Sequence, residues 1–319
     1  MTNDIVQYQS KAIQTRTESP LKQFLAGQLS AQTKRAYQTD IRLFFEYTGL
    51  NPDDVLNYDL NEIYSMVIQY RDSISKIQDG TKFIINASTV ARKMTAIKTY
   101  FDFLVKLKLI SINPASDIKS PAINPDSTSE GLTLSELKSI FSLIDNRVII
   151  GKRDKAILSL MFHCALRRSE VAKLKIQDIR TSAEFQIIRF IGKRNKVREI
   201  PLKPEVMETI KDYLTATGRN LSSGGFMFLS HSNRNNGTDN ISPETIFYLV
   251  KRYTNKAKIN KRITPHSFRH TAVTLSLDNG SSYRDVMNLT GHSDPKLVKR
   301  YDRGDKLKNN ATWKLPSIN

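Results

Sequence analysis

Hydrophobic residues recur at helical spacing through the first part of the chain. The clearest run follows Ser88, where apolar positions recur at intervals of four, three, four and three and therefore share one helix face. Its members are Val90, Met94, Ile97, Phe101 and Leu104. A second run covers residues 30–47, with Ser30 as N-cap and Gly49 as stop signal, and residues 60–77 form a third, less regular candidate. The pattern predicts an all-helical first domain over residues 20–112, preceded by an extension over residues 1–19.

Residues 113–131 carry neither a helical nor a strand period. They hold three prolines among several Ser, Asp and Asn residues, which is typical of a linker between domains. Helical spacing resumes over residues 134–144 and returns in four later segments: 205–214, 243–256, 267–277 and 295–301. Two β-rich stretches, 185–191 and 197–202, flank a turn that begins at Gly192, which indicates a hairpin. We expect a mainly α protein whose second domain, residues 132–301, includes a small antiparallel β-sheet and is followed by a tail over residues 302–319.

The charge balance favours a polyanionic partner. The chain of 319 residues holds 49 Lys and Arg against 31 Asp and Glu, a formal net charge of +18. The excess is uneven, because residues 1–120 hold 15 basic and 12 acidic side chains whereas residues 121–319 hold 34 and 19. The second domain therefore carries most of the positive field.

Cysteine usage and hydropathy indicate a compartment. The one cysteine, Cys164, excludes an internal disulfide, and its apolar neighbours Met161 and Phe162 indicate a small buried hydrophobe in a reducing environment. The first twelve residues lack the basic start and the apolar run of a secretory signal, and no apolar run has the length of a membrane span. We expect a cytoplasmic protein with access to DNA, associated with the nucleoid when bound.

Basic side chains lie on the polar faces of the predicted first-domain helices and on the predicted hairpin. They are Lys34, Arg35, Arg42, Arg92, Lys93 and Lys98 on the helices, and Arg194, Lys196 and Arg198 on the hairpin. Such rows suit contact with a phosphate backbone. Solvated faces have the same composition, so charge alone leaves both interpretations open.

Residues suited to phosphate chemistry follow one another in the second domain. In chain order they are Arg167 with Glu170, Lys193, His266 with Arg269, His292 and Tyr301. A phenol can displace an alkoxide from a phosphodiester if cations hold the non-bridging oxygens and a donor protonates the leaving oxygen. Arginine grips two oxygens at once, histidine accepts a proton near neutral pH, and a desolvated lysine can donate one.

Each member also has an ordinary structural interpretation. Arg167 with Glu170 is typical of a surface ion pair, Lys193 of a solubilising turn residue, and Tyr301 of a core or interface residue. His292 and Tyr301 are nine residues apart, so one continuous helix would place them on opposite sides, and only a break over residues 291–295 lets both face one site. The fixed order within a basic domain favours the chemical interpretation.

The strings ALRRSEV, IGKRNKVREIPL, HSFRH and LTGHSDP, followed by Tyr301, closely resemble the catalytic boxes of the tyrosine recombinase and integrase family, especially its simple Xer-like members. The resemblance covers residues 132–301, and the helical first half resembles the family's core-binding domain. Departures are small: Ala165, Arg168 and Thr290 stand where the family commonly has a glycine, an apolar residue and a leucine. None of them removes a reacting group.

The resemblance implies a site-specific DNA recombinase that works through a 3′-phosphotyrosyl bond and needs no ATP, metal or other cofactor. Tyr301 would attack the scissile phosphate. Arg167 and Arg269 would hold its non-bridging oxygens, and His292 would donate a hydrogen bond to the phosphate. Lys193 would protonate the leaving 5′ oxygen, and His266 would assist proton transfer from the phenol. Glu170 would support these residues.

The implied partners are a core site in double-stranded DNA and further copies of the chain, four in all on two synapsed duplexes. Accessory proteins that bend DNA or set directionality are also implied. The tail would dock onto a neighbouring subunit through Leu307, Trp313 and Leu315, its alternative being a frayed terminus. Two rival functions are a type IB topoisomerase, which religates the same strand, and a DNA-binding protein that keeps the fold without catalysis. The core-binding half argues against the first, and the complete set of reacting residues argues against the second.

Overall fold

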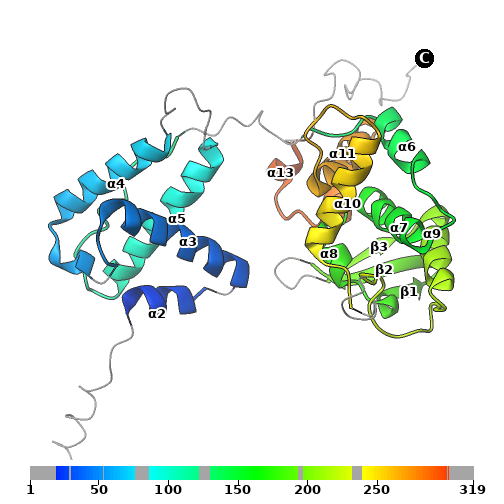
Figure 1. The fold of residues 1–319 in the computed structure, drawn as a ribbon, viewed down its shortest axis with the longest axis horizontal. Coiled ribbons are helices and arrows are strands. Elements are labelled where there is room, and N and C mark those ends of the chain that lie inside the picture. Colours follow the sequence, from blue (N-terminus) through cyan, green and yellow to red (C-terminus); the bar gives the residue numbers. More distant parts are fainter. Residues whose placement is uncertain are drawn as a thin grey trace, which may run out of the picture. The chain divides into compact units, whose positions relative to one another are not determined.

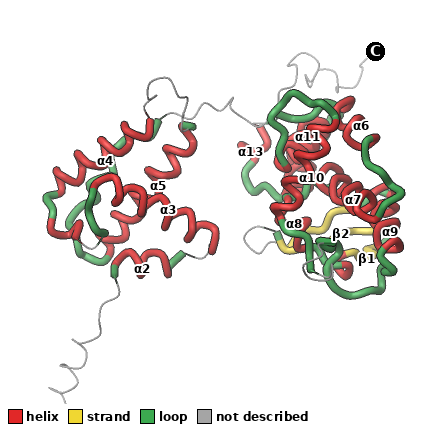
Figure 2. Tube along the Cα trace, viewed as in Figure 1, coloured by secondary structure: helices red, strands yellow, loops and turns green. Residues whose placement is uncertain are grey.

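The computed structural model describes residues 19–28, 30–52, 54–75, 86–121, 130–192, 197–231, 239–299 and 301 (Figures 1 and 2). The chain divides into two compact units, Met1–Asp126 and Ser127–Asn319. Several predicted features lie outside the described residues: Lys193, Arg194 and Lys196 of the hairpin, and the tail with Leu307, Trp313 and Leu315. None of the described helices is both long and apolar enough to cross a membrane.

The described regular elements of the first unit are all helices, as predicted. Its elements are α2 (Pro20–Ala26), α3 (Ala31–Thr48), the 3-10 helix η1 (Asp54–Asn57), α4 (Leu60–Ser75) and α5 (Ala87–Lys106). Ser30 caps α3 by accepting a hydrogen bond from the backbone N–H of Thr33, and Gly49 ends it in the left-handed region at φ 73°. The apolar stripe of α5 is buried against α3 and α4, so the three predicted helices are confirmed and α2 is added to them.

The predicted linker begins later than its composition indicated. Ala115 and Ile118 are buried in the core of the first unit, and the Asn113 side chain donates to the backbone oxygen of Lys98 and to Asp102. The segment from residue 113 to 118 is therefore part of the first unit. Pro114 and its polar neighbours fold into a turn, which lacks a period that sequence patterns could detect.

The second unit places helices around a small sheet. Its elements are α6 (Leu134–Ser142), α7 (Ile149–His163), α8 (Arg168–Lys173), η2 (Ile176–Asp178), β1 (Ile179–Ser182), β2 (Phe185–Ile191), β3 (Val197–Pro201), α9 (Pro204–Ala216), α10 (Pro243–Lys256), α11 (Pro265–Asp278), α12 (Tyr283–Thr290) and α13 (Pro295–Lys299). The sheet is antiparallel in the order β1-β2-β3, with Ile188 opposite both Ile179 and Ile200. The predicted hairpin is confirmed as β2 and β3, and β1 is an additional strand.

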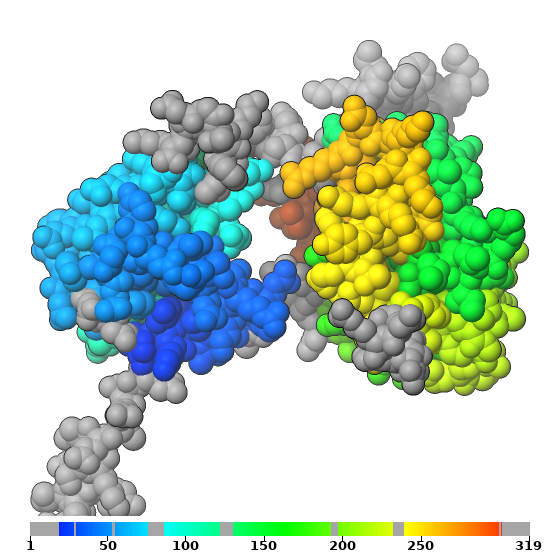
Figure 3. Space-filling view, in the orientation of Figure 1, coloured from blue at the N-terminus to red at the C-terminus, as the bar shows by residue number. Residues whose placement is uncertain are grey.

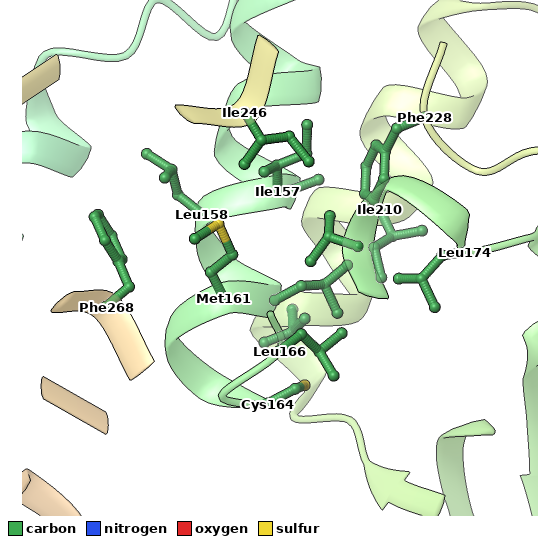
Figure 4. Close-up of a cluster of buried hydrophobic side chains, with 14 of the residues drawn as sticks. Ile157, Leu158, Met161, Cys164, Leu166, Leu174, Ile210, Phe228, Ile246 and Phe268 are labelled. Atoms are coloured by element: carbon green, nitrogen blue, oxygen red, sulfur yellow. The ribbon is translucent and has the colours of Figure 1, made fainter. Parts of the chain in front are cut away.

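Helix α7 is the centre of the second core. It packs between α9 and α11, and its residues are buried on all sides from Ala156 to Met161, as expected for a helix enclosed by others (Figure 4). Cys164 follows it, buried beside Leu166, and burial raises the pKa of its thiol to about 12. The predicted role of Cys164 as a small buried hydrophobe is confirmed, and α7 gives the segments that follow it a rigid base.

Candidate active site

Arg167 and Glu170 lie where the chain leaves α7 and enters α8. Arg167 is the residue before α8 and Glu170 is at its third position. One Glu170 oxygen accepts from the Arg167 backbone N–H at 2.8 Å, and the other accepts from Nη1 of the Arg167 side chain at 2.8 Å. We predicted a pair on one helix face, whereas the structure makes Arg167 the cap, with a side chain that is still 33% exposed. Its remaining donors can reach a ligand.

The neighbouring arginine points elsewhere. The Arg168 guanidinium lies over the ring of Phe247 on α10, 5.7 Å from its centroid. Arg168 is the residue that departs from the family pattern, and its contact with an aromatic ring explains how a cation is tolerated at a usually apolar position. Arg167 is therefore the arginine of this pair that lies at the Glu170 carboxylate.

Arg269 joins three segments in the interior of the second unit. It lies one turn into α11, which begins at Pro265, and it is 1% exposed. Its Nη1 donates to the backbone oxygen of Ala165 at 2.6 Å, and its Nη2 donates to the backbone oxygen of Thr290. Burial, reinforced by the charge of Arg167, lowers its pKa to about 9, so Arg269 is still a cation at neutral pH.

His292 contacts Arg269 directly. Arg269 Nη2 lies 3.3 Å from His292 Nε2, and because a guanidinium only donates, Nε2 must accept and the ring hydrogen belongs on Nδ1. Burial and the charges of Arg269 and Arg167 lower the pKa of His292 to about 4. The pKa of His266 is also lowered, by burial first and then by the same two arginines. Both imidazoles are therefore neutral at neutral pH.

A break between two helices brings His292 and Tyr301 together, as predicted. Helix α12 ends at Thr290, its C-cap Gly291 has φ 71°, and α13 begins at Pro295. The rings of His292 and Tyr301 lie nearly parallel, with their centroids 6.3 Å apart. Tyr301 is half-buried against an apolar cluster of Val273, Leu277, Val286 and Val298, so its ring is held while part of it remains accessible.

The site contains more buried donors than acceptors. Among the described residues, none accepts a hydrogen bond from Nε of Arg269, from Nδ1 of His292, or from Nε and Nη1 of Arg198. Glu170 is the carboxylate that faces these cations. Leaving buried donors unsatisfied is costly, so this arrangement is typical of a site that binds an anion.

Sequence reasoning missed one ring that contacts Tyr301. His270 is buried on α11, and its ring meets that of Tyr301 edge-on with the centroids 5.0 Å apart. It stands in the HSFRH string but received no role. Its place four residues after His266, one turn along the same helix, was the available signal.

The basic residues predicted to contact DNA divide into two groups. Lys34 and Arg35 are exposed at the start of α3. Others are engaged within the protein: Arg42 with Glu46, Arg92 and Lys93 with Asp40, and Lys98 with the backbone oxygen of Ser116. Lys93 and Arg198 are each 8% exposed, a burial that their predicted contact with a phosphate backbone did not include. Sequence composition could not reveal this burial, because it depends on residues from other elements that pack over the two side chains.

The surface of the second unit also presents an aromatic side chain among basic ones. Tyr248 is exposed on α10, which lies at the surface in the space-filling view (Figure 3, yellow). Lys251 follows on the same helix, with its ammonium 5.5 Å from the Phe247 ring centroid.

No group of three or more His, Cys, Asp or Glu side chains in the described part of the chain could hold a metal ion.

Comparison with known proteins gives the family. Residues 130–307 match the phage integrase family, and residues 21–108 match its N-terminal SAM-like domain. A tyrosine recombinase of Pseudothermotoga lettingae is 31% identical over 276 residues, covering 86% of this chain and 87% of its own. The fold is similar to the XerH recombinase bound to palindromic difH DNA, with a TM-score of 0.66, 18% identity and coverage of 88% of this chain and 80% of that one. A λ integrase dimer bound to a core site has a TM-score of 0.66, 15% identity and coverage of 95% and 99%. The chain belongs to the phage integrase family, the tyrosine recombinases that cleave and rejoin DNA at specific sites.

Proposed function

We propose that Tyr301 is the nucleophile of this recombinase and that the surrounding residues form its phosphate-binding site. The phenol oxygen attacks the scissile phosphorus, the bond from phosphorus to the 5′ oxygen breaks, and a 3′-phosphotyrosyl bond forms. The 5′ hydroxyl of a partner strand reverses the step, so the bond energy is conserved. The observation that carries the proposal is the pair of buried donors without acceptors beside the Tyr301 ring, Nε of Arg269 and Nδ1 of His292.

The cations of the site suit the charge that develops on the phosphorane. Arg167 offers its exposed nitrogens and Arg269 its unsatisfied Nε to the non-bridging oxygens, while Nδ1–H of His292 donates a third hydrogen bond. These donors are held in place before the substrate arrives, so little reorganisation is needed in the transition state. Glu170 fixes Arg167 and offsets part of the positive charge.

Two residues move protons in the proposed step. His266 has a lowered pKa and is neutral at neutral pH, so it can accept the phenolic proton as Tyr301 attacks. Lys193, which lies outside the described residues, protonates the departing 5′ oxygen. With both transfers the atoms and charges balance, and the chain supplies every group that the step requires.

We further propose that the substrate is a core site in double-stranded DNA and that four copies act on two synapsed duplexes. In support, the solved relatives are complexes with difH DNA and with a core site, the latter as a dimer. The positive excess of residues 121–319 suits the same partner. The cytoplasmic location, the docking tail and the accessory proteins stay predictions.

A nicked duplex carrying a candidate core site tests the nucleophile. Cleavage near a nick releases a short 5′ product, which prevents religation and traps the covalent complex. We expect a covalent complex with the native protein, none with Tyr301→Phe, and retained DNA binding in both. Tyr283→Phe is the matched control, because that ring packs against the same apolar cluster. A covalent complex that persists in Tyr301→Phe would contradict the proposal, and relaxation of a plasmid without any recombinant product would support a topoisomerase instead.

A further inference from the structure

Arg198 lies inside the candidate active site rather than on the surface. It is the second residue of β3, and its side chain is 8% exposed. One face of its guanidinium covers the ring of Phe190 on β2, 4.8 Å from the centroid. The guanidinium thus lies between the sheet, α8 and the end of α12.

The Arg198 guanidinium contacts two segments that carry reacting groups. Its Nη2 donates to the backbone oxygen of Leu289, three residues before His292. Its Nη1 lies 3.5 Å from Oε1 of Glu170, the same oxygen that accepts from Arg167 at 2.8 Å. Arg198 therefore links the carboxylate that holds Arg167 to the helix end that precedes His292.

Gly291 fits tightly against this guanidinium. A Cβ atom at Gly291 would lie 2.8 Å from Cδ of Arg198 and 2.9 Å from its Nε, closer than side chains pack. Gly291 also has φ 71°, a conformation that other residues rarely adopt. The turn before His292 is thus shaped to receive the Arg198 side chain.

The buried charge of Arg198 is unfavourable for the stability of the fold. Burial lowers the pKa of Arg198, the carboxylate of Glu170 raises it, and the charge of Arg167 lowers it again. A buried cation without a full set of acceptors usually destabilises a protein relative to an apolar residue. Its presence beside Arg167 and Arg269 points to a contribution to the site rather than to stability.

We propose that Arg198 is a positioning residue of the recombinase, an inference that rests on the proposed function of this site. By holding Glu170 and the end of α12 together, it sets the distance between Arg167 and His292 before the phosphate binds. It acts through these neighbours and does not contact the DNA backbone. Misplacing a reacting group by about 1 Å can cost about a hundredfold in rate, so loss of the Arg198 contacts should slow the reaction measurably.

The test compares variants of the full chain on the nicked duplex, under single turnover and at saturating DNA. Arg198→Met keeps the length of the side chain without donors, and Arg198→Lys keeps the charge but cannot reach Leu289 and Glu170 together. We expect both to form the covalent complex about ten- to a hundredfold more slowly than the native protein, with an unchanged Kd for DNA. Arg189→Met is the matched control, since Arg189 on β2 is an exposed partner of Glu199 and its loss should leave the rate unchanged.

Two further measurements separate positioning from misfolding. Gly291→Ala should displace the Arg198 side chain and slow the reaction to a similar degree without removing a charge. On a duplex with a neutral methylphosphonate at the scissile position, the loss of rate in Arg198→Met should be smaller. This substrate lacks the negatively charged non-bridging oxygen that Arg167 is proposed to bind. An equal loss on both substrates would indicate general damage and overturn the proposal.

The remaining outcomes are equally decisive. A native rate in Arg198→Met, full rescue by Arg198→Lys, or a weaker Kd that accounts for the slower reaction would each overturn the positioning role. Absence of any covalent complex with the native protein would instead refute the proposed nucleophile.

Discussion

At the scale of single residues, the charges around His292 determine its protonation. Its pKa is lowered from 6.5 to about 4 by burial and by nearby arginines, so the unfolded chain binds this proton more readily than the folded one. Stability is therefore fully present above about pH 6.5 and is lost as the pH falls towards about 4. The expected loss is on the order of 1 kcal/mol once solvent screening of this half-buried ring is included.

Chemical unfolding of the native chain and of His292→Gln, compared between pH 7 and pH 4.5, checks this prediction. The native free energy of unfolding should fall more steeply than that of the variant, which lacks the titrating ring. Parallel curves for the two proteins would show that the ring titrates normally.

His270 gives a second prediction at this scale. Its ring contacts that of Tyr301, and Gly131 leaves it room, because a Cβ there would lie 2.8 Å from His270 Nδ1. His270→Ala should let the Tyr301 ring move and slow formation of the covalent complex about tenfold, with DNA binding retained. Thr274→Val is the control, since it removes only a 3.4 Å contact of Thr274 with the His270 ring. A native rate in His270→Ala would show that the apolar cluster alone holds Tyr301.

Residue identity alone predicted candidate reacting groups but not their neighbours. Arg167, His266, Arg269, His292 and Tyr301 were predicted because their chemistry suits a phosphate. Arg198 was grouped with the hairpin side chains predicted to contact DNA, whereas its environment is created by Leu289 and Gly291, which are about ninety residues away in sequence. A basic strand residue looks the same whether a helix end covers it or water does.

At the scale of elements, Asp154 connects α7 to α10. This fully buried carboxylate accepts from Arg153 Nη2 at 2.9 Å and from the Tyr253 hydroxyl at 3.2 Å, and it pairs with Arg252. Asp154→Ala leaves the buried Arg153 and Tyr253 without this acceptor, which should cost about 3–5 kcal/mol in the free energy of unfolding. Urea unfolding measures this change in the free energy of unfolding. Asp145→Ala is the control, because Asp145 pairs with Arg147 at the surface. A loss no larger than that of Asp145→Ala would show that the network is dispensable.

Elements were predictable where their hydrophobic period was long. Helix α5 shows a full stripe of apolar residues and was found with nearly its observed start. Strand β1 was missed because its four residues are exposed or half-exposed and show no alternation. Helix α2 has only seven residues, too few for a periodic signal.

At the scale of the whole molecule, the described residues form one large hydrophobic core in each of the two units. One contains Phe101 and Met94, and the other contains Leu158 and Ile157. Phe101→Ala and Leu158→Ala should each cost about 3 kcal/mol, and each should lower only one of two unfolding transitions in the full chain. Calorimetry of both variants checks this. A substitution that lowers both transitions equally would show that the two units unfold as one.

The proposed covalent bond between the Tyr301 oxygen and DNA can be tested by mapping the residue that carries the DNA. The covalent complex from a nicked duplex is digested with a protease and a nuclease, and the peptide carrying a nucleotide is identified by mass spectrometry. We expect a single modified peptide, with a 3′-phosphoryl group on Tyr301. Modification at any other residue, with Tyr301 unmodified, would contradict it.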